Sequence, residues 1–322
     1  MHISVGTFNV NNLFSRFNFE LKAEVEKLPE GKVPFTKIRQ IVDDVGAEMV
    51  QYEGWALKRK DPKERRIIAD RIKTMDLDVI ALQEVEDIET LRYFTHTELN
   101  NLYPYAMLIE GNDPRLIDVA VLSKLPIGQA TTWQTAAEPT APKDRIFSRD
   151  LLQVEILNNE HKPLLTLFAT HLKSHYVPFT EDQEEGAKQA NERRRLQAET
   201  AALIIEKTMR PDSRFIVLGD MNDGPDSAFL RPLLDNVDLQ LVNGLANAKE
   251  TRAAPKTNAP IPTSTWTHRF KPTGKPAHYE LFDHIWLSPS LAPKLKAAYI
   301  DRRTKMGGDG SDHDPAWVEL DV

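Results

Sequence analysis

The chain contains no cysteine in its 322 residues. This absence excludes disulfide bonds, thiolate nucleophiles and zinc sites built from cysteine. Any bound metal must therefore be held by oxygen atoms and imidazole nitrogens. The sequence also lacks any run close to the roughly 18 apolar residues that a membrane-spanning helix requires, so no transmembrane segment is expected.

The chain has fewer basic than acidic residues: 41 Lys and Arg against 48 Asp and Glu give a net charge of -7. An acidic chain has no global field that attracts nucleic acid, although a local basic patch could still bind it. The first ten residues alternate like a strand and lack the charged and apolar blocks of a secretory signal. We expect a soluble protein that is cytoplasmic as the chain stands, or secreted or periplasmic if a signal peptide has been removed.

The composition, with 41% hydrophobic and 28% charged residues, is that of a globular protein with a large core. Short apolar runs that end in polar residues recur along the chain and predict buried strands. Helical spacing of apolar residues predicts helices at 61–75, 88–99 and 181–209, and a helical insertion near 17–57. Strands are expected at residues 3–10, 78–85, 105–109, 117–122, 151–157, 164–170, 215–218, 281–287 and 316–322.

The segment 214–224 carries the clearest chemical signal. Asp220 and Asn222 follow a buried strand, and Gly219 lets the backbone turn where that strand ends. If strand geometry persists to the tip, the carboxylate and the amide point the same way. Such a pair could take a proton from water and hold that water or a phosphoryl oxygen. The same residues would also suit an Asx turn that only caps the strand.

Polar side chains stand at other strand ends as well. Asn9, Asn11 and Asn12 surround the end of the first strand, either as turn formers or as part of a site. Glu84 ends an apolar strand, where desolvation is costly unless a cation or hydrogen bonds offset it, so it is either a metal ligand or half of a structural ion pair. A sheet can gather such positions on one rim. They recur at Asn9, Glu84, His171, Asp220, Asp283, and Asp312 with His313.

These residues lie in an ordered series of motifs: Thr-Phe-Asn-Val, Ala-Leu-Gln-Glu-Val, Thr-His-Leu-Lys, Leu-Gly-Asp-Met-Asn, Phe-Asp-His and Ser-Asp-His-Asp-Pro. The series spans the chain from the first strand to the last. It resembles the endonuclease/exonuclease/phosphatase superfamily, which includes deoxyribonucleases, abasic-site endonucleases, neutral sphingomyelinases and inositol-polyphosphate phosphatases. The resemblance implies one domain over residues 1–322. Its fold would be a four-layer α/β sandwich, with two mixed β-sheets packed face to face and helices outside.

The resemblance also implies a metal-dependent hydrolase that acts on phosphoester bonds. A phosphodiester needs a cation against its oxygens, a positioned water and help for the leaving group. Glu84 is the expected ligand of Mg²⁺, or of Mn²⁺, with Asn9 nearby and Asp312 contributing. Asp220 would orient and deprotonate the attacking water, and Asn222 would fix the geometry.

Two imidazoles complete the expected site. By the same resemblance, His313 would contact the phosphate, and Asp283 would hold its ring and favour the charged form. His171 would be a second imidazole at the phosphate. Lys173 and Arg149 are either phosphate contacts or solvated charges. Which imidazole serves the leaving group stays open.

The segment 247–278 bears on the substrate, because it is basic and includes Trp266 and Phe270. It is either a clamp for a nucleic-acid backbone or a proline-rich surface loop, and the charge run Arg193–Arg195 could add to such a clamp. We expect an endonuclease acting on nucleic acid; the alternative is a phosphoesterase for small molecules or lipid head groups. A pure binding module is disfavoured because every catalytic position is filled, and no obligate protein partner is indicated. The basic residues of the segment 247–278 are Lys249, Arg252, Lys256, Arg269, Lys271 and Lys275, and its one acidic residue is Glu250.

Overall fold

The computed structural model describes residues 1–14 and 60–322, apart from residues 139, 179, 211, 256–260, 263–264, 272–273 and 308. The expected helical insertion near residues 17–57 lies outside the described residues. The chain divides into two compact units, Met1–Leu13 with Asp61–Val322, and Phe14–Lys60. All helices and strands given below belong to the first unit.

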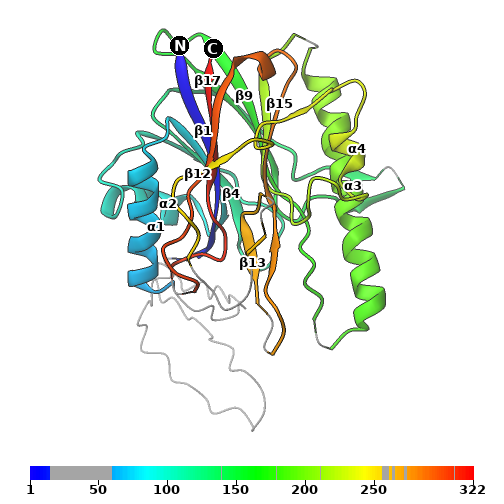
Figure 1. Ribbon diagram of the computed structural model, residues 1–322. Helices are drawn as coiled ribbons and strands as arrows, with labels where there is room; N and C mark the ends of the chain where they lie inside the picture. The colour runs from blue at the N-terminus through cyan, green and yellow to red at the C-terminus, as the bar shows by residue number, and fades with distance from the viewer. Residues whose placement is uncertain are drawn as a thin grey trace, which may run out of the picture. The chain divides into compact units, whose positions relative to one another are not determined.

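Two large sheets form the centre of this unit (Figure 1). Both are mixed, since β1 runs parallel to β2 and antiparallel to β17, and β10 runs parallel to β9 and antiparallel to β15. The first sheet has seven strands, in the spatial order β12 (Lys249–Glu250), β16 (Leu295–Ile300), β17 (Ala316–Asp321), β1 (His2–Leu13), β2 (Val79–Val85), β4 (Asp118–Ser123) and β3 (Tyr105–Leu108). The second has six, in the order β11 (Val242–Asn243), β15 (Asp283–Leu287), β10 (Phe215–Asp220), β9 (Pro163–His171), β8 (Leu151–Leu157) and β5 (Ile127–Thr132).

Small hairpins and helices complete the unit. The hairpins are β6 (Ala137–Glu138) with β7 (Ala141–Arg145), and β13 (His268–Phe270) with β14 (His278–Glu280). The helices are α1 (Pro62–Met75), α2 (Ile88–Thr97), α3 (Gln183–Thr208) and α4 (Arg231–Leu234), with a 3₁₀ turn at Ala292–Lys294. α1 begins where it does because the Asp61 carboxylate accepts a hydrogen bond from the Lys63 amide and proline occupies the next position. Asp182 caps α3 in the same way.

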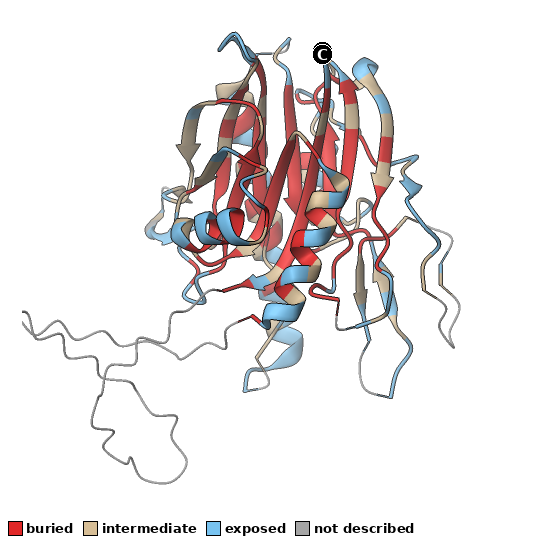
Figure 2. Cartoon of the chain, turned by 90° about the vertical axis from the view of Figure 1, so that its left-hand side faces the viewer, coloured by how far each residue is buried: buried red, intermediate tan, exposed pale blue. Residues whose placement is uncertain are grey.

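Three apolar cores separate four layers. One lies between the two sheets, one joins the seven-stranded sheet to α1 and α2, and one joins the six-stranded sheet to α3 and α4. Figure 2 shows buried strands behind helices whose outer sides are exposed. The expected four-layer α/β sandwich is therefore confirmed. No helix in the described part of the chain has the length and hydrophobicity that crossing a membrane requires.

The alternation of side chains along the strands places polar groups at one end of the core between the sheets. On β10, Ile216 and Leu218 point into that core, and Asp220 is the next residue on the same face. The same parity puts Asn9 on β1, His171 on β9 and Asp283 on β15 between the sheets. The polar residues therefore share one location because the apolar residues that precede them share one core.

A substitution at Gly219 would test how much the backbone before Asp220 can move. Its φ is +136°, and a Cβ at this position would lie 1.9 Å from the carbonyl oxygen of Thr170. We expect Gly219→Ala to lower the free energy of unfolding by about 2 kcal/mol or more, because the backbone would have to move next to Asp220. Thermal denaturation would measure the loss. Gly224→Ala is the control, since a Cβ there would have no atom within 4 Å; equal stability of the two variants would contradict the prediction.

Candidate active site

Asp220 lies at the centre of the polar cluster. Its cross-strand neighbours in the six-stranded sheet are Asp283 and His171. The side chain is buried and accepts two hydrogen bonds, from the Asn222 backbone N–H to Oδ1 at 2.8 Å and from Asn9 Nδ2 to Oδ2 at 2.8 Å. The carboxylate is thus held by both sheets at once, because Asn9 comes from β1 and Asp220 from β10.

Two imidazoles face the same carboxylate oxygen. His171 Nε2 lies 3.5 Å from Asp220 Oδ2, and His313 Nε2 lies 3.7 Å from it. His313 is oriented from behind by Asp283, whose Oδ2 lies 2.7 Å from Nδ1. The Ser311 hydroxyl accepts the His313 backbone N–H and donates to the carbonyl of Asn9, so the loop that carries His313 is tied to β1. Four of the five expected catalytic side chains therefore converge on one point.

The electrostatics give the two imidazoles opposite charge states. Burial alone would lower the pKa of His313, but the Asp283 and Asp220 carboxylates outweigh it and raise the pKa to about 10. Burial lowers the pKa of His171 well below its usual value, and the positive charges of Arg149 and His313 lower it further. At neutral pH the cluster therefore holds one imidazolium and one neutral imidazole.

Asp220 is tuned as well. Burial raises its pKa to about 7, and Asp283 adds to this rise, while His313 and the hydrogen bonds from Asn9 and Asn222 oppose it. A carboxylate whose pKa lies near neutrality can accept a proton from water and release it again. The environment therefore suits Asp220 to the work of a general base.

Asn222, the fifth expected catalytic residue, acts on Asp220 through its backbone. Its side-chain Nδ2 donates to the carbonyl of Leu172 at 3.0 Å, and its φ is +53°. This left-handed turn is what brings its N–H back to the Asp220 carboxylate. The amide side chain thus fastens the turn after β10 to the residue that follows β9.

Glu84 and Asp312 present oxygen atoms beside this cluster. Glu84 sits at an irregularity in the pairing of β2 with β4 and has a φ of +65°, which is uncommon for a residue other than glycine. Its Oε2 accepts the Asn12 N–H at 3.0 Å. Asp312 Oδ1 accepts a hydrogen bond from Asn11 Nδ2 at 2.9 Å. Asn11 and Asn12 also have positive φ, so the end of β1 turns its polar groups toward both carboxylates.

The amide of Asn9 is oriented as a donor. Its oxygen accepts the Asn11 N–H at 2.9 Å, and its Nδ2 faces Asp220 and, at 3.4 Å, Glu84 Oε1. A side-chain NH₂ group cannot bind a cation. In this orientation the Asn9 amide bridges the Asp220 and Glu84 carboxylates, and the expected metal contact through its oxygen stays a prediction.

The two expected phosphate contacts lie in different settings. Arg149 is 1% exposed and donates to Asp113 at 3.1 Å and to the carbonyl of Leu172, which favours a structural role. Lys173 is half-buried, and its Nζ donates to the carbonyls of Ser174 and Tyr176. Burial, followed by the charge of Arg149, lowers the pKa of Lys173 to about 8. Lys173 therefore lies two residues from His171 and loses its proton more readily than an ordinary lysine.

The charge run Arg193–Arg195 could add to a clamp only as exposed charges, but Arg194 is completely buried. Its guanidinium donates to Asp223 at 3.1 Å and to the carbonyl of Lys173, and so holds the segment that follows His171. The signal was present, because Arg194 stands four residues after Ala190 and four before Ala198 on the buried face of α3. Arg195 does lie outside, paired with Glu192.

His268 is a second residue that the sequence did not single out. It begins β13, bridges to His313 through the backbone, and stacks on Phe282 with ring centroids 4.7 Å apart. Its Nε2 lies 3.6 Å from Asp312 Oδ2. No local sequence pattern predicts this contact, because it joins two segments more than forty residues apart.

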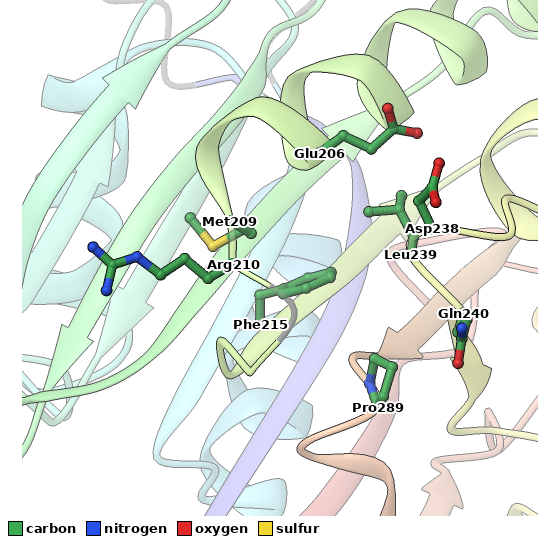
Figure 3. A pocket seen from close by; sticks show the side chains of 8 residues that line it. All are labelled: Glu206, Met209, Arg210, Phe215, Asp238, Leu239, Gln240 and Pro289. Carbon is green, nitrogen blue, oxygen red and sulfur yellow. The ribbon is translucent and has the colours of Figure 1, made fainter.

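A cavity lies beside the end of α3 and is lined by Met209, Phe215 and Pro289 among others (Figure 3). It includes none of the candidate residues.

Comparisons with known proteins show the family and the fold. The model of the Endonuclease/Exonuclease/phosphatase family matches residues 6–313. No curated protein matches the sequence significantly. Among solved structures, an AP endonuclease from Archaeoglobus fulgidus is similar at 15% identity and a TM-score of 0.58, over 99% of this chain and 100% of that one. TDP2 from D. rerio, complexed with a single-strand DNA product, is similar at 13% identity and a TM-score of 0.58, over 100% and 99%.

A further similar structure is named for a different activity. It is a mannosyl-6-phosphatase from Bacteroides thetaiotaomicron, at 16% identity and a TM-score of 0.54, over 81% of this chain and 91% of that one. At these identities the structural likeness shows the fold alone. The match of the family model confirms the resemblance expected from the motifs.

The charge states of the two imidazoles can be measured directly. In metal-free protein, we expect the His313 ring to stay protonated up to about pH 10, while His171 stays neutral through pH 7. Nitrogen NMR of the imidazoles over a pH series would report both. Asp283→Asn should lower the pKa of His313, because it removes the carboxylate at 2.7 Å. A His313 that titrates near its ordinary pKa of about 6.5 in the unaltered protein would contradict this assignment.

Asp220 should destabilise the folded state as pH rises. Its folded pKa of about 7 lies above the ordinary value of about 3.9 for an unfolded chain, so its favourable contribution is complete below pH 4 and is lost as pH rises through 7. Asp220→Asn removes this titration. We therefore expect the Tm of the variant, relative to wild type, to be higher at pH 8 than at pH 4. A difference in Tm that does not change with pH would show that Asp220 is not held neutral.

Proposed function

Because the chain belongs to the endonuclease/exonuclease/phosphatase family, whose members are phosphoester hydrolases, we propose that it hydrolyses phosphodiester bonds in nucleic acid with the help of Mg²⁺. The observation that carries the proposal is the convergence of His171, His313 and the Asn9 amide on one buried carboxylate, Asp220. Such a cluster joins a base, an imidazolium and a neutral imidazole within one small volume. A base can activate water, and the imidazole groups can donate hydrogen bonds to the phosphate, so this set of groups can support hydrolysis of a phosphoester.

The residues beside the cluster fit a hard divalent cation. Glu84 and Asp312 offer carboxylate oxygens, which Mg²⁺ prefers, and few protein ligands are needed because Mg²⁺ keeps several waters. Glu84 and Asp312 would hold the ion, with Mn²⁺ as a substitute. When bound, the ion would neutralise charge on the non-bridging oxygens of the phosphate.

The chain's own residues would perform the remaining steps. Asp220 would accept a proton from the attacking water, and the backbone N–H of Asn222 keeps its carboxylate in place. His313, charged and held by Asp283, would donate a hydrogen bond to a phosphate oxygen. His171, as a neutral imidazole, can donate a hydrogen bond without adding charge. The leaving group would take its proton from one of these imidazoles or from water.

The hairpin β13–β14 supports a nucleic acid as the substrate. It leads directly into β15, which begins at Asp283. Phe270 is 57% exposed, and Lys271 and Lys275 are exposed and form no salt bridge within the described residues. An exposed aromatic beside cations can stack on a base while the cations contact the backbone. Trp266 does not share this role, because it is buried with the Arg302 guanidinium 3.8 Å from its ring centroid.

A small phosphoester remains the second candidate. The likeness to a mannosyl-6-phosphatase supports it, since the same fold serves a sugar phosphate there. The two candidates differ in their dependence on the hairpin, because a small substrate would occupy only the cluster around Asp220.

Nicking of supercoiled plasmid in Mg²⁺ or Mn²⁺ tests the proposed activity. We expect nicking by the wild-type protein, none after chelation, and a rate lower by about 10²-fold or more for Asp220→Asn, because the base is lost. The folded state of the variant would be checked by circular dichroism. Wild-type activity in a folded Asp220→Asn protein would overturn the assignment of the base. Intact plasmid together with hydrolysis of a small phosphoester would favour the second candidate.

The hairpin has its own test. We expect Lys271→Glu with Lys275→Glu to weaken nucleic-acid binding several-fold at low salt and to flatten its salt dependence, because fewer counterions are released. Hydrolysis of a small chromogenic phosphodiester should not change. Lys188→Glu with Lys207→Glu, on α3, is the matched control for net charge. Equal loss of binding in both pairs would argue that only the net charge matters.

A further inference from the structure

We propose that His268, Asp312 and His313 form a second metal-binding site, for a transition-metal ion such as Zn²⁺, and that an ion bound there blocks the hydrolysis. These three residues can each offer one ligand atom, and the atoms lie within 4.8 Å of one another. The site shares Asp312 with the proposed Mg²⁺ site and differs from it because it uses two imidazoles and not Glu84. The blocking effect rests on the proposed function, whereas the binding does not.

The distance between His268 and Asp312 fits a shared cation. His268 Nε2 and Asp312 Oδ2 are 3.6 Å apart, which is too long for a good hydrogen bond. Two ligand atoms on a tetrahedral ion with bonds of about 2.0–2.1 Å lie about 3.4 Å apart, so little movement is needed. Asp312 Oδ1 is already occupied by Asn11 Nδ2, which leaves Oδ2 to face the imidazole.

His313 is oriented as a ligand histidine would be. Its Nδ1 contacts the Asp283 carboxylate at 2.7 Å, and its Nε2 is therefore directed toward the site. Histidines that bind metals typically donate the other ring N–H to a carboxylate, which fixes the ring and strengthens the ligand. Because His313 is protonated at neutral pH, a bound ion would displace the proton on Nε2 into solvent. The carboxylates of Asp220, Asp283 and Asp312 around this ring favour a divalent cation in place of that proton.

His268 is held in position before any ion arrives. Its ring stacks on Phe282 with an interplanar angle of 10°, and its backbone bridges to His313. The amide of Arg269 donates to the carbonyl of Asp312 at 3.3 Å, so the two ligand segments are joined on either side of the site. The Asp312 side chain is half exposed, which gives ions access from solvent.

The ligand set determines which ion would bind. Two imidazole nitrogens and one carboxylate oxygen suit Zn²⁺, Co²⁺ or Ni²⁺, whereas Mg²⁺ prefers oxygen ligands. Three protein ligands leave one position of the ion for water. An ion at this site would occupy His313 Nε2 and Asp312 Oδ2, both of which the proposed hydrolysis uses. Zn²⁺ would therefore inhibit a reaction that Mg²⁺ supports.

The test compares two histidines that both stack on the Phe282 ring. His268→Phe keeps an aromatic ring on Phe282 and removes the ring nitrogens, and His175→Phe is the matched control, because His175 also stacks on Phe282, with ring centroids 5.8 Å apart. Protein freed of transition metals would be placed in buffer with excess Mg²⁺. It would be titrated with Co²⁺, with binding measured by visible absorbance, and separately with Zn²⁺, with binding measured by calorimetry. Circular dichroism would confirm folding. His268→Gln is the second variant should the phenylalanine not be accommodated.

We expect the wild type and His175→Phe to bind one ion with similar affinity, and His268→Phe to bind it about tenfold or more weakly. The Zn²⁺ concentration that halves plasmid nicking should rise by the same factor, with the rate in Mg²⁺ alone within about twofold of wild type. Unchanged Co²⁺ and Zn²⁺ binding in both His268 variants, or no binding to wild type, would overturn the inference. Absence of hydrolysis on every substrate would overturn the proposed function, and binding that still depends on His268 would leave the site standing.

Discussion

The register of three neighbouring strands, β15, β10 and β9, determines the candidate site. It places Asp283, Asp220 and His171 side by side across the sheet. A slip of one residue on β10 would turn Asp220 away from the other sheet and toward α3, because successive side chains point to opposite faces. The apolar residues between the sheets prevent this slip, since Ile216 and Leu218 would have to leave their core as well. The packing of the core thus fixes the chemistry at its edge.

The candidate site contains several features that lower the stability of the folded state, although the rest of the unit is well packed. Asp220 and Asp283 are buried neighbours of like charge, and the imidazolium of His313 lies between them. Glu84 and Asn222 have positive φ, a backbone conformation that costs of order 1 kcal/mol or more for a residue with a side chain. A chain selected only for stability would avoid these features. Their concentration at one edge of two sheets is itself an argument that this edge performs chemistry.

Much of this arrangement could be predicted from the sequence. Apolar runs ending in polar residues located β1, β2, β9 and β10, and the order of the motifs implied the sandwich. Strand parity could place Asn9 and Asp220 on inward faces, but it could not tell which atom of the Asn9 amide faces the carboxylate. That orientation depends on the turn at Asn11, whose φ is positive. The strands β5 and β16 were missed, because neither has the dense apolar run that marked the others.

The residues that sequence reasoning misjudged are those whose surroundings come from distant segments. The sequence indicates that Arg149 is either a phosphate contact or a solvated charge and that Arg194 belongs to a charge run that could join a clamp, but each is buried against carbonyl groups that follow β9. Trp266 looked like an aromatic available to a base, but Arg302 covers it. In each case a long-range partner satisfies the side chain, and no local periodicity encodes that partner. His268 went unnoticed for the same reason.

Thr267 connects the hairpin β13–β14 to the His313–Asp283 pair. The Thr267 hydroxyl accepts the backbone N–H of Asp283 at 3.0 Å, and its carbonyl accepts the N–H of Asp314 at 2.8 Å. One residue at the base of the hairpin therefore holds both segments that form the His313–Asp283 pair. A substrate that contacts the hairpin would act on the geometry of this pair, whereas one confined to the Asp220 cluster would not. An AP endonuclease and a mannosyl-6-phosphatase share this fold, so the fold alone does not select the phosphoester, and a choice of substrate must come from segments that adjoin the catalytic cluster, as this hairpin does through Thr267.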